Sequence, residues 1–305
     1  MQPLRGITFK IGSVCVFVAM AAIIKATAGQ VPPGQAVFFR SLFAAPVILV
    51  WLMLRGEGLA VLRPRDPMGH LWRGLVGTTA MGLGFAGLGL LPLPEVTAIG
   101  YAAPLLTVVF AAMFLGEQVR LFRLSAVALG MVGVMIVLSP RLTLAAGVSP
   151  VETLGAVVTL GGAVFVALAQ VQVRKLVATE GTAAIVFWFS ISAACLSLLS
   201  LPWGWTIPSP QTAGLLILAG FLGGLGQILL TSSYRFADAS LVAPFEYTSM
   251  LLALGVGFFV FAETPSLTIL AGAAIIIAAG VLIIWRERQL GIERARQRSA
   301  GTPGG

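Results

Sequence analysis

Ionisable side chains inside long apolar runs are the residues of this sequence best placed to do chemistry. Glu246 lies about six residues into the apolar run 240–262, and Arg40 lies about five residues into the run 35–54. A charged side chain at the centre of a bilayer costs about 2.5–3.5 kcal/mol on insertion scales, so such residues usually serve a function. We expect Glu246 to bind substrate and carry a coupled proton, because burial favours the neutral carboxyl group. We expect Arg40 to bind a carboxylate or phosphate through its planar guanidinium.

Each of these assignments has a structural alternative. Glu246 could be an acid whose hydrogen bonds a neighbouring helix satisfies. Arg40 could extend its charged head to the membrane surface while its stem stays among apolar side chains. Lys25 could assist Arg40, but it has the same alternative. What surrounds these residues therefore decides between a substrate site and a structural role.

Aromatic and amide side chains at five further positions could complete a substrate cavity. Tyr101 and Tyr247 bring hydroxyl groups, and Trp188 could stack on a flat substrate. Packing alone also explains Tyr101, and an aromatic belt at the membrane interface also explains Trp188. The predicted substrate-binding residues are Glu246, Arg40, Tyr101, Gln170, Trp188, Gln227 and Tyr247.

Two prolines predict where membrane-spanning helices break. Pro104 lies within the apolar run 96–115, and Pro244 lies two residues before Glu246. Proline removes a backbone donor and its ring clashes with the preceding turn of a helix. Irregular backbone at membrane depth is tolerated only where protein covers it or where it lines a cavity. Pro104 and Pro244 therefore predict helix breaks beside a cavity.

The sequence lacks the motifs of enzymes, ATPases and metal sites. It contains no His-Glu-x-x-His, no Walker motif and no zinc-type spacing. The single histidine, His70, lies in a polar connection, where we expect it to be solvated. Cys15 and Cys195 lie in apolar runs and predict no disulfide. We therefore expect no enzymatic activity, no metal and no cofactor, and coupling to a proton, an ion or a counter-substrate.

Composition places these residues in a membrane. Hydrophobic residues make up 58% of the 305 and charged residues 10%, whereas soluble domains have about a quarter charged residues. A spanning helix needs about 20 mostly apolar residues. The predicted fold class is an all-α membrane protein with ten transmembrane helices. The ten predicted spans are 7–27, 35–54, 72–91, 96–115, 121–139, 152–173, 182–201, 211–233, 240–262 and 266–285.

Basic residues predict the orientation in a bacterial inner membrane. With both termini in the cytoplasm, all but three of the 19 lysines and arginines lie on the cytoplasmic side, Lys10 and Arg73 among them. The exceptions are Lys25, Arg40 and Arg141. This asymmetry follows the positive-inside rule. It also explains the net charge of +8 without a nucleic-acid partner, because the charges lie in short connections and meet lipid headgroups.

Two segments repeat across the chain. VFVAMA at 16–21 recurs as VFVALA at 164–169, and Tyr101 precedes Glu117 by the same interval as Tyr247 precedes Glu263. The sequence therefore predicts two five-helix repeats, over 1–145 and 146–286, followed by a disordered basic tail over 287–305. Because five is odd, the second repeat enters the membrane inverted. We expect Glu117 and Glu263 to be structural gates or to cap the helices that follow them, rather than to bind substrate.

The repeats and their motifs resemble the drug/metabolite transporter superfamily, and within it the EamA-type transporters. The telling segments are YAAPLLTVVFAAMFLGE, which ends at Glu117, and YRFADASLVAPFEY, which begins at Tyr234. The second copy departs from the Gly-Glu ending, since Ala262 stands where the first has Gly116. The resemblance implies ten helices and coupled movement of small organic molecules. The early stretch VPPGQAVFFRSLFA is similar to the riboflavin and S-adenosylmethionine uptake branches.

We therefore predict a secondary transporter that takes up a small metabolite, riboflavin first and S-adenosylmethionine second. Export of amino acids or drug-like compounds is the alternative within transport. A membrane sensor or structural protein is the alternative outside it. Polar residues that converge from several spans favour transport, because the substrate sites of such repeats lie between the halves near mid-membrane. Glycine-rich helix faces leave a homodimer open.

Overall fold

The computed structural model describes residues 3–115, 121–142, 149–177, 179–236 and 243–300. These residues form α-helices and short 3₁₀ helices, and they contain no β-strand. The first repeat contains α1 (Pro3–Thr27), α2 (Pro33–Leu42), α3 (Ala44–Leu54), η1 (Leu59–Leu62), α4 (Pro67–Leu90), α5 (Leu93–Gly100), α6 (Ala102–Leu115) and α7 (Leu121–Leu142). The second contains α8 (Pro150–Val177), α9 (Thr182–Ser197), η2 (Leu198–Ser200), α10 (Pro210–Phe236), η3 (Ala243–Tyr247), α12 (Thr248–Phe261) and α13 (Leu267–Ala300).

The helices confirm the prediction of an all-α membrane protein. Eight segments within the described residues are long and apolar enough to cross a membrane. The segment Phe245–Phe261 is shorter, and α4 occupies the remaining predicted span. Large apolar side chains such as Phe259 and Leu267 are more than four-fifths exposed on the outer faces. Such a surface suits lipid, because soluble proteins rarely expose large contiguous apolar patches.

Two of the spans are broken, and a proline accounts for each break. The fourth span divides into α5 and α6 at Tyr101, and the second divides into α2 and α3 at Phe43. Pro104 and Pro46 each lie three residues beyond the break. The helix before each break ends four residues ahead of the proline. Proline has no N–H to donate to the carbonyl of that residue, and its ring clashes with the same carbonyl. The break at Pro104 was predicted, whereas Pro46 carried the same signal and was overlooked.

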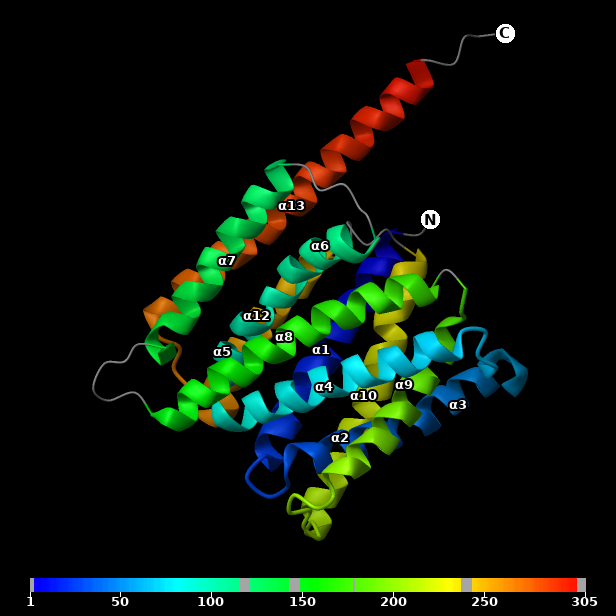
Figure 1. Cartoon of the computed structure of the whole chain (residues 1–305), viewed down its shortest axis with the longest axis vertical. Helices are drawn as coiled ribbons and strands as arrows, with labels where there is room; N and C mark the ends of the chain where they lie inside the picture. Colours follow the sequence, from blue (N-terminus) through cyan, green and yellow to red (C-terminus); the bar gives the residue numbers. More distant parts are fainter. Residues whose placement is uncertain (1–2, 116–120, 143–148, 178, 237–242, 301–305) are drawn as a thin grey trace.

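Helices of the first repeat pack against helices of the second, and each such pair has an equivalent pair in which the repeats have swapped roles. α1 packs along α10, and its counterpart α8 packs along α4 (Figure 1). α7 and α13, the last helices of the two repeats, pack against each other, as do α2 and α9. α1 runs away from the end where the chain begins, while α8 runs back toward it. This interchange is the arrangement expected of inverted repeats.

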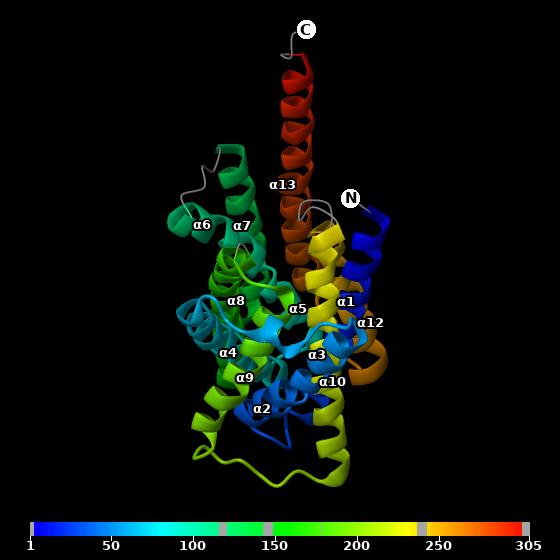
Figure 2. The same ribbon diagram turned by 90° about the vertical axis from the view of Figure 1, so that its right-hand side faces the viewer.

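The bundle has two different ends. α1 begins at one end, called the N-terminal end below, and α13 extends beyond the bundle there (Figure 2). The α1–α2, α4–α5, α9–α10 and α12–α13 connections lie at the opposite end, called the distal end. Buried apolar side chains from five helices of both repeats fill the distal half. They include Met20, Ile24, Ala36, Val37, Phe85, Leu88, Leu216, Ala219 and Ala253.

The last helix continues further than the spanning segment requires. α13 remains helical to Ala300, through most of the region 287–305 for which the sequence predicted a disordered tail. The boundaries proposed for the two repeats, at 145 and 286, stay a prediction. Glu117 lies outside the described residues.

Candidate functional site

A polar cluster lies where the broken fourth span meets the start of the ninth. Glu246 belongs to η3, a 3₁₀ turn, rather than to the α-helix that the sequence suggested. Its Oε2 atom lies 3.0 Å from Nζ of Lys10 on α1, which links the two repeats. The Glu246 side chain is 42% exposed, whereas that of Lys10 is 1% exposed. An acid that is accessible on one side and paired on the other can take part in exchange.

Lys10 corrects an interpretation made from the sequence. It was counted among the cytoplasmic charges, although it lies within the predicted span 7–27. The structure buries its ammonium group against Glu246. Lys10 is a candidate functional residue on the same grounds as Glu246 and Arg40, because an ionisable residue at membrane depth is usually functional.

Tyr101 and Tyr247 meet at the seam between the repeats. Their ring centroids lie 5.2 Å apart with an interplanar angle of 71°. The Tyr101 hydroxyl lies 2.7 Å from the Ser249 hydroxyl and donates to the Tyr247 carbonyl at 3.4 Å. Tyr101 caps α5 at the first break, and Tyr247 caps α12 where η3 ends. Two residues at equivalent places in the repeats therefore pack together beside Glu246.

Lys25 and Glu263 tie the repeats together at the distal end. Lys25 Nζ lies 2.8 Å from Glu263 Oε1 and donates to the Leu91 carbonyl at 2.6 Å, at the end of α4. Glu263 Oε2 accepts from the Leu93 amide at 2.8 Å, at the start of α5. Each charge thus complements a helix dipole. Glu263 was expected to be a gate or to cap the helix that follows it, α13. Its carboxylate instead caps α5 of the first repeat, because α12, which precedes Glu263, packs against α5.

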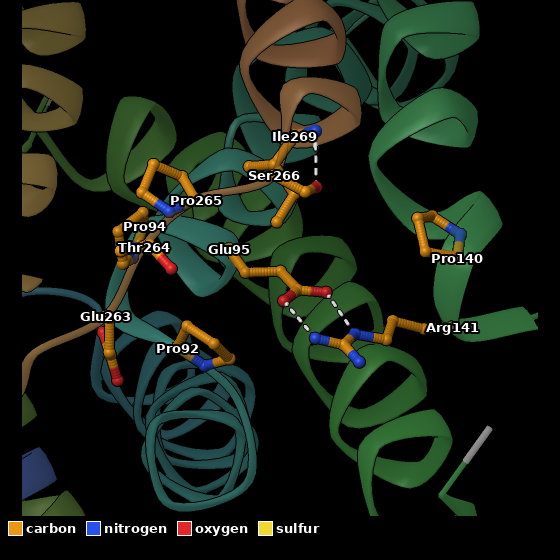
Figure 3. Close-up of a pocket in the computed structure, with 10 residues that line it drawn as sticks. All are labelled: Pro92, Pro94, Glu95, Pro140, Arg141, Glu263, Thr264, Pro265, Ser266 and Ile269. Carbon is orange, nitrogen blue, oxygen red and sulfur yellow. Dashed lines mark hydrogen bonds and ion pairs between the residues drawn. The ribbon is translucent and has the colours of Figure 1, made fainter. Parts of the chain in front are cut away.

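A second ionic cluster lies beside this tie. Arg141, at the end of α7, donates from Nε to Glu95 Oε1 at 2.8 Å and from Nη2 to Glu95 Oε2 at 3.1 Å (Figure 3). Arg141 also pairs with Glu152 of the second repeat. Glu95 and Arg141 line a cavity of about 240 Å³ at the distal end, together with Pro92, Pro94, Pro140, Glu263, Thr264, Pro265, Ser266 and Ile269. Glu95 is fully buried, and it was not among the residues predicted from the sequence.

His70 and Glu180 close part of the N-terminal end. His70 was expected to be solvated, but it is 4% exposed in the first turn of α4, with Nε2 at 3.3 Å from Glu180 Oε1. The same oxygen accepts from the backbone amides of Arg65 and Asp66 at 2.6 and 2.7 Å. Desolvation raises the pKa of Glu180, but these amide bonds and the nearby His70 outweigh it, so the net direction is downward.

This lowered pKa predicts a pH-dependent contribution to stability. The contribution is fully present above the ordinary pKa of a glutamate and is lost as the pH falls through the lowered value. We expect Glu180→Gln to reduce stability by about 1–3 kcal/mol at pH 7, since it weakens hydrogen bonds to a buried charge. Thermal unfolding of the detergent-solubilised protein at several pH values measures this. A difference between variant and parent that grows as the pH falls toward 4 would contradict the assignment.

The remaining predicted site residues lie in different surroundings. Trp188 donates its indole N–H to the Leu62 carbonyl at 2.7 Å, so this donor is used to hold η1. Gln227 is half-buried on α10. Gln170 is exposed near the N-terminal end of the bundle, although Ala163 and Thr159, on the same face of α8, are buried. The face of α8 that is buried at Thr159 and Ala163 is therefore exposed at Gln170.

Arg40 is 3% exposed on α2. It therefore does not extend to the membrane surface, as the structural alternative required. Pro244 lies in η3, so the ninth span begins with a 3₁₀ turn. Cys15 and Cys195 are both free and exposed.

Comparison with known proteins decides the family. The model of the EamA-like transporter family matches residues 4–139 and, a second time, residues 153–285. The chain belongs to the EamA-like transporter family. The two matches coincide with the two sets of five spans, and the resemblance stated from the sequence is confirmed. The chain is thus a multi-pass membrane transporter built from two repeats.

Relatives within the EamA-like family carry different cargo. The chain is 30% identical to the pseudopaline exporter of Pseudomonas aeruginosa over 269 residues, which cover 88% of this chain and 91% of the exporter. It is 29% identical to an S-adenosylmethionine uptake transporter of Rickettsia bellii, with 84% of each chain covered. It is 30% identical to a riboflavin transporter of Rhizobium johnstonii, with 84% and 82% covered. A crystal structure at 22% identity has a TM-score of 0.66 over 90% of this chain and 95% of that one, which shows the fold alone.

Proposed function

We propose that this EamA-type protein is a secondary transporter that moves a small organic metabolite across the bacterial cytoplasmic membrane by alternating access. One observation carries the proposal. Ion pairs and apolar side chains from both repeats join the distal end around its cavity of about 240 Å³, whereas the side chains of Glu246 and Gln170, nearer the N-terminal end, are partly exposed and exposed, respectively. With both termini in the cytoplasm, as the basic residues indicate, this conformation is open inward. Exchange of the two repeat conformations would open the distal end.

The Lys10–Glu246 pair supplies a means of coupling. A proton that binds Glu246 neutralises the carboxylate and weakens its attraction for Lys10 at 3.0 Å. A cationic group of a substrate could compete with Lys10 for the same carboxylate. Either event loosens the contact between α1 and the start of the ninth span. Because η3 is a 3₁₀ segment with poorer hydrogen bonds than an α-helix, it can adjust its conformation at modest cost.

For the substrate we propose uptake of S-adenosylmethionine or riboflavin, the cargo of two of the relatives. Tyr247, which is half-buried beside Glu246 and backed by the buried Tyr101, offers aromatic surface for the flat ring system that both compounds contain. Export is the second candidate, because the pseudopaline exporter is as similar to this chain as the riboflavin transporter.

Uptake of labelled compounds into proteoliposomes tests the proposal. We expect labelled S-adenosylmethionine or riboflavin to accumulate when the outside is acidic, and a protonophore to abolish the accumulation. Protein-free liposomes provide the background. Rescue of a bacterial riboflavin auxotroph on low riboflavin separately tests direction. A folded, reconstituted protein that moves no compound of a panel including amino acids and drug-like cations above background would reject a transport role.

A further inference from the structure

Two arginines, Arg40, which is buried, and Arg73, which is half-buried, lie against one aromatic ring, apart from the Glu246 cluster. Arg40 on α2 and Arg73 on α4 place their Cζ atoms 5.8 and 3.9 Å from the ring centroid of Phe189 on α9. Arg73 had been counted only as one of the cytoplasmic charges that set the orientation, and it belongs to the second turn of α4. The first repeat thus brings two positive charges to one aromatic ring of the second.

Two nitrogens of each guanidinium group lack a hydrogen-bond partner. Nε and Nη1 of Arg40 and the same two atoms of Arg73 are buried, and no acceptor within the described residues reaches them. No carboxylate in this part of the chain lies within ion-pair distance of either group either. The cation–π attraction to the Phe189 ring offsets part of the cost of burying the charge. The ring provides no hydrogen-bond acceptor for these N–H groups. Buried charges are normally paired, and unpaired like charges destabilise a fold.

Glycines make room for these guanidinium groups. A Cβ atom on Gly223 of α10 would lie 2.7 Å from Arg40 Nε, and its three nearest neighbours would all be Arg40 atoms. A Cβ atom on Gly77 of α4 would collide with Arg73 Nη1. Gly77 and Gly223 are separated by the same interval as Tyr101 and Tyr247, so they occupy equivalent places in the two repeats. Both repeats therefore contribute space to one charged site.

We propose that Arg40 and Arg73 bind an oxyanion, a carboxylate or phosphate group carried by the transported substrate. Guanidinium groups bind such oxygens with two parallel hydrogen bonds, which would satisfy the orphaned donors. This inference rests on the proposed transport function and narrows its substrate class. S-adenosylmethionine carries a carboxylate, whereas riboflavin carries no ionised group at neutral pH. The site therefore places S-adenosylmethionine ahead of riboflavin, the reverse of the order predicted from the sequence.

Binding measurements on the detergent-solubilised protein in chloride buffer test the site without requiring transport. The probes are S-adenosylmethionine and its decarboxylated analogue, riboflavin 5′-phosphate and riboflavin, and inorganic phosphate. We expect the oxyanion member of each pair to bind more tightly, and Arg40→Gln or Arg73→Gln to weaken it by about 10- to 100-fold. Arg63→Gln, which removes an exposed arginine outside the site, should change nothing.

A milder variant tests the geometry and guards against misfolding. Gly223→Ala keeps both arginines but displaces the Arg40 guanidinium, a flexible end that can move without disturbing the backbone. Oxyanion affinity should fall in this variant. Gly214→Ala on the same helix, where a Cβ would meet nothing within 4 Å, should retain it. In the absence of oxyanions, Arg73→Gln should unfold at a temperature equal to or above that of the parent, because the substitution removes a positive charge whose buried Nε and Nη1 atoms have no acceptor.

The remaining outcomes separate the alternatives. Nanodiscs of phosphatidylcholine with and without phosphatidylglycerol distinguish a soluble substrate from a lipid headgroup, since a headgroup in the site would compete with the soluble probes. Such competition, or equal affinity of every oxyanion probe for the parent and both arginine variants, overturns the proposal. Binding that depends on the two arginines, without any uptake, would instead reject the transport function and support the oxyanion site. Coupled uptake that does not depend on Arg40 and Arg73 would support the transport function and reject the oxyanion site.

Discussion

Replacing Glu246 with glutamine is expected to reduce proton-driven uptake to the level of protein-free liposomes while the protein still inserts and folds. Glutamine has nearly the same shape, but it cannot release a proton or carry charge. In the parent, the Glu246 carboxylate lies 3.0 Å from Lys10 and is accessible on its other side. A proton arriving there changes the strength of an ion pair that joins the repeats. In the variant no protonation step at this position can do so.

The measurement is uptake of labelled substrate against an imposed pH gradient, compared with exchange of labelled for unlabelled substrate at equal pH. Exchange requires substrate movement but no net proton transfer, so Glu246→Gln should lose the first more completely than the second. Glu57→Gln provides a matched control, because Glu57 pairs with Arg55 in the α3–η1 connection, away from the seam. Uptake by Glu246→Gln at the parental rate and with the parental pH dependence would exclude Glu246 from coupling.

Local patterns predicted the spans because lipid demands them. All ten predicted spans correspond to helices or pairs of helices, and the break at Tyr101 follows from Pro104 four residues after the last carbonyl of α5. A helix in lipid must satisfy its backbone within the segment, so its length and its interruptions are set by neighbouring residues. The sequence identified Tyr101 and Tyr247 as equivalent residues of the two repeats but did not predict their contact, which the structure shows.

Such local patterns could not predict the ion pairs and hydrogen bonds that join residues of different repeats. Lys10 and Glu246 are separated by 236 residues, and Glu263 caps α5, which begins 170 residues earlier. Lys10 and Arg73 were interpreted as topology charges because they lie near the ends of their spans. His70 was expected in water because it precedes an apolar run. Each error has one cause: burial near a helix end depends on which other helix packs there.

Cross-linking the distal end is expected to stop transport completely and reversibly. Cysteines at positions 25 and 263, in a chain whose native Cys15 and Cys195 are replaced by serine, would stand where Lys25 and Glu263 now form an ion pair at 2.8 Å. These positions belong to opposite repeats, at the end that the proposed cycle must open. A short thiol-specific cross-linker joining them would hold the transporter in the inward-open state. Cleaving the linker with reductant should restore uptake.

The Arg55–Glu57 pair supplies the control for this experiment. It is also an ion pair, at 2.8 Å, but both residues belong to one short connection, so linking cysteines there constrains no movement between repeats. Uptake should survive the same reagent in that variant. Binding should survive in both, because the inward-open state still admits substrate from the N-terminal end. Transport at the parental rate through a protein fully cross-linked between positions 25 and 263 would show that the distal seam stays shut throughout the cycle. The substrate would then need a path other than the one between the repeats, since a closed end cannot give alternating access.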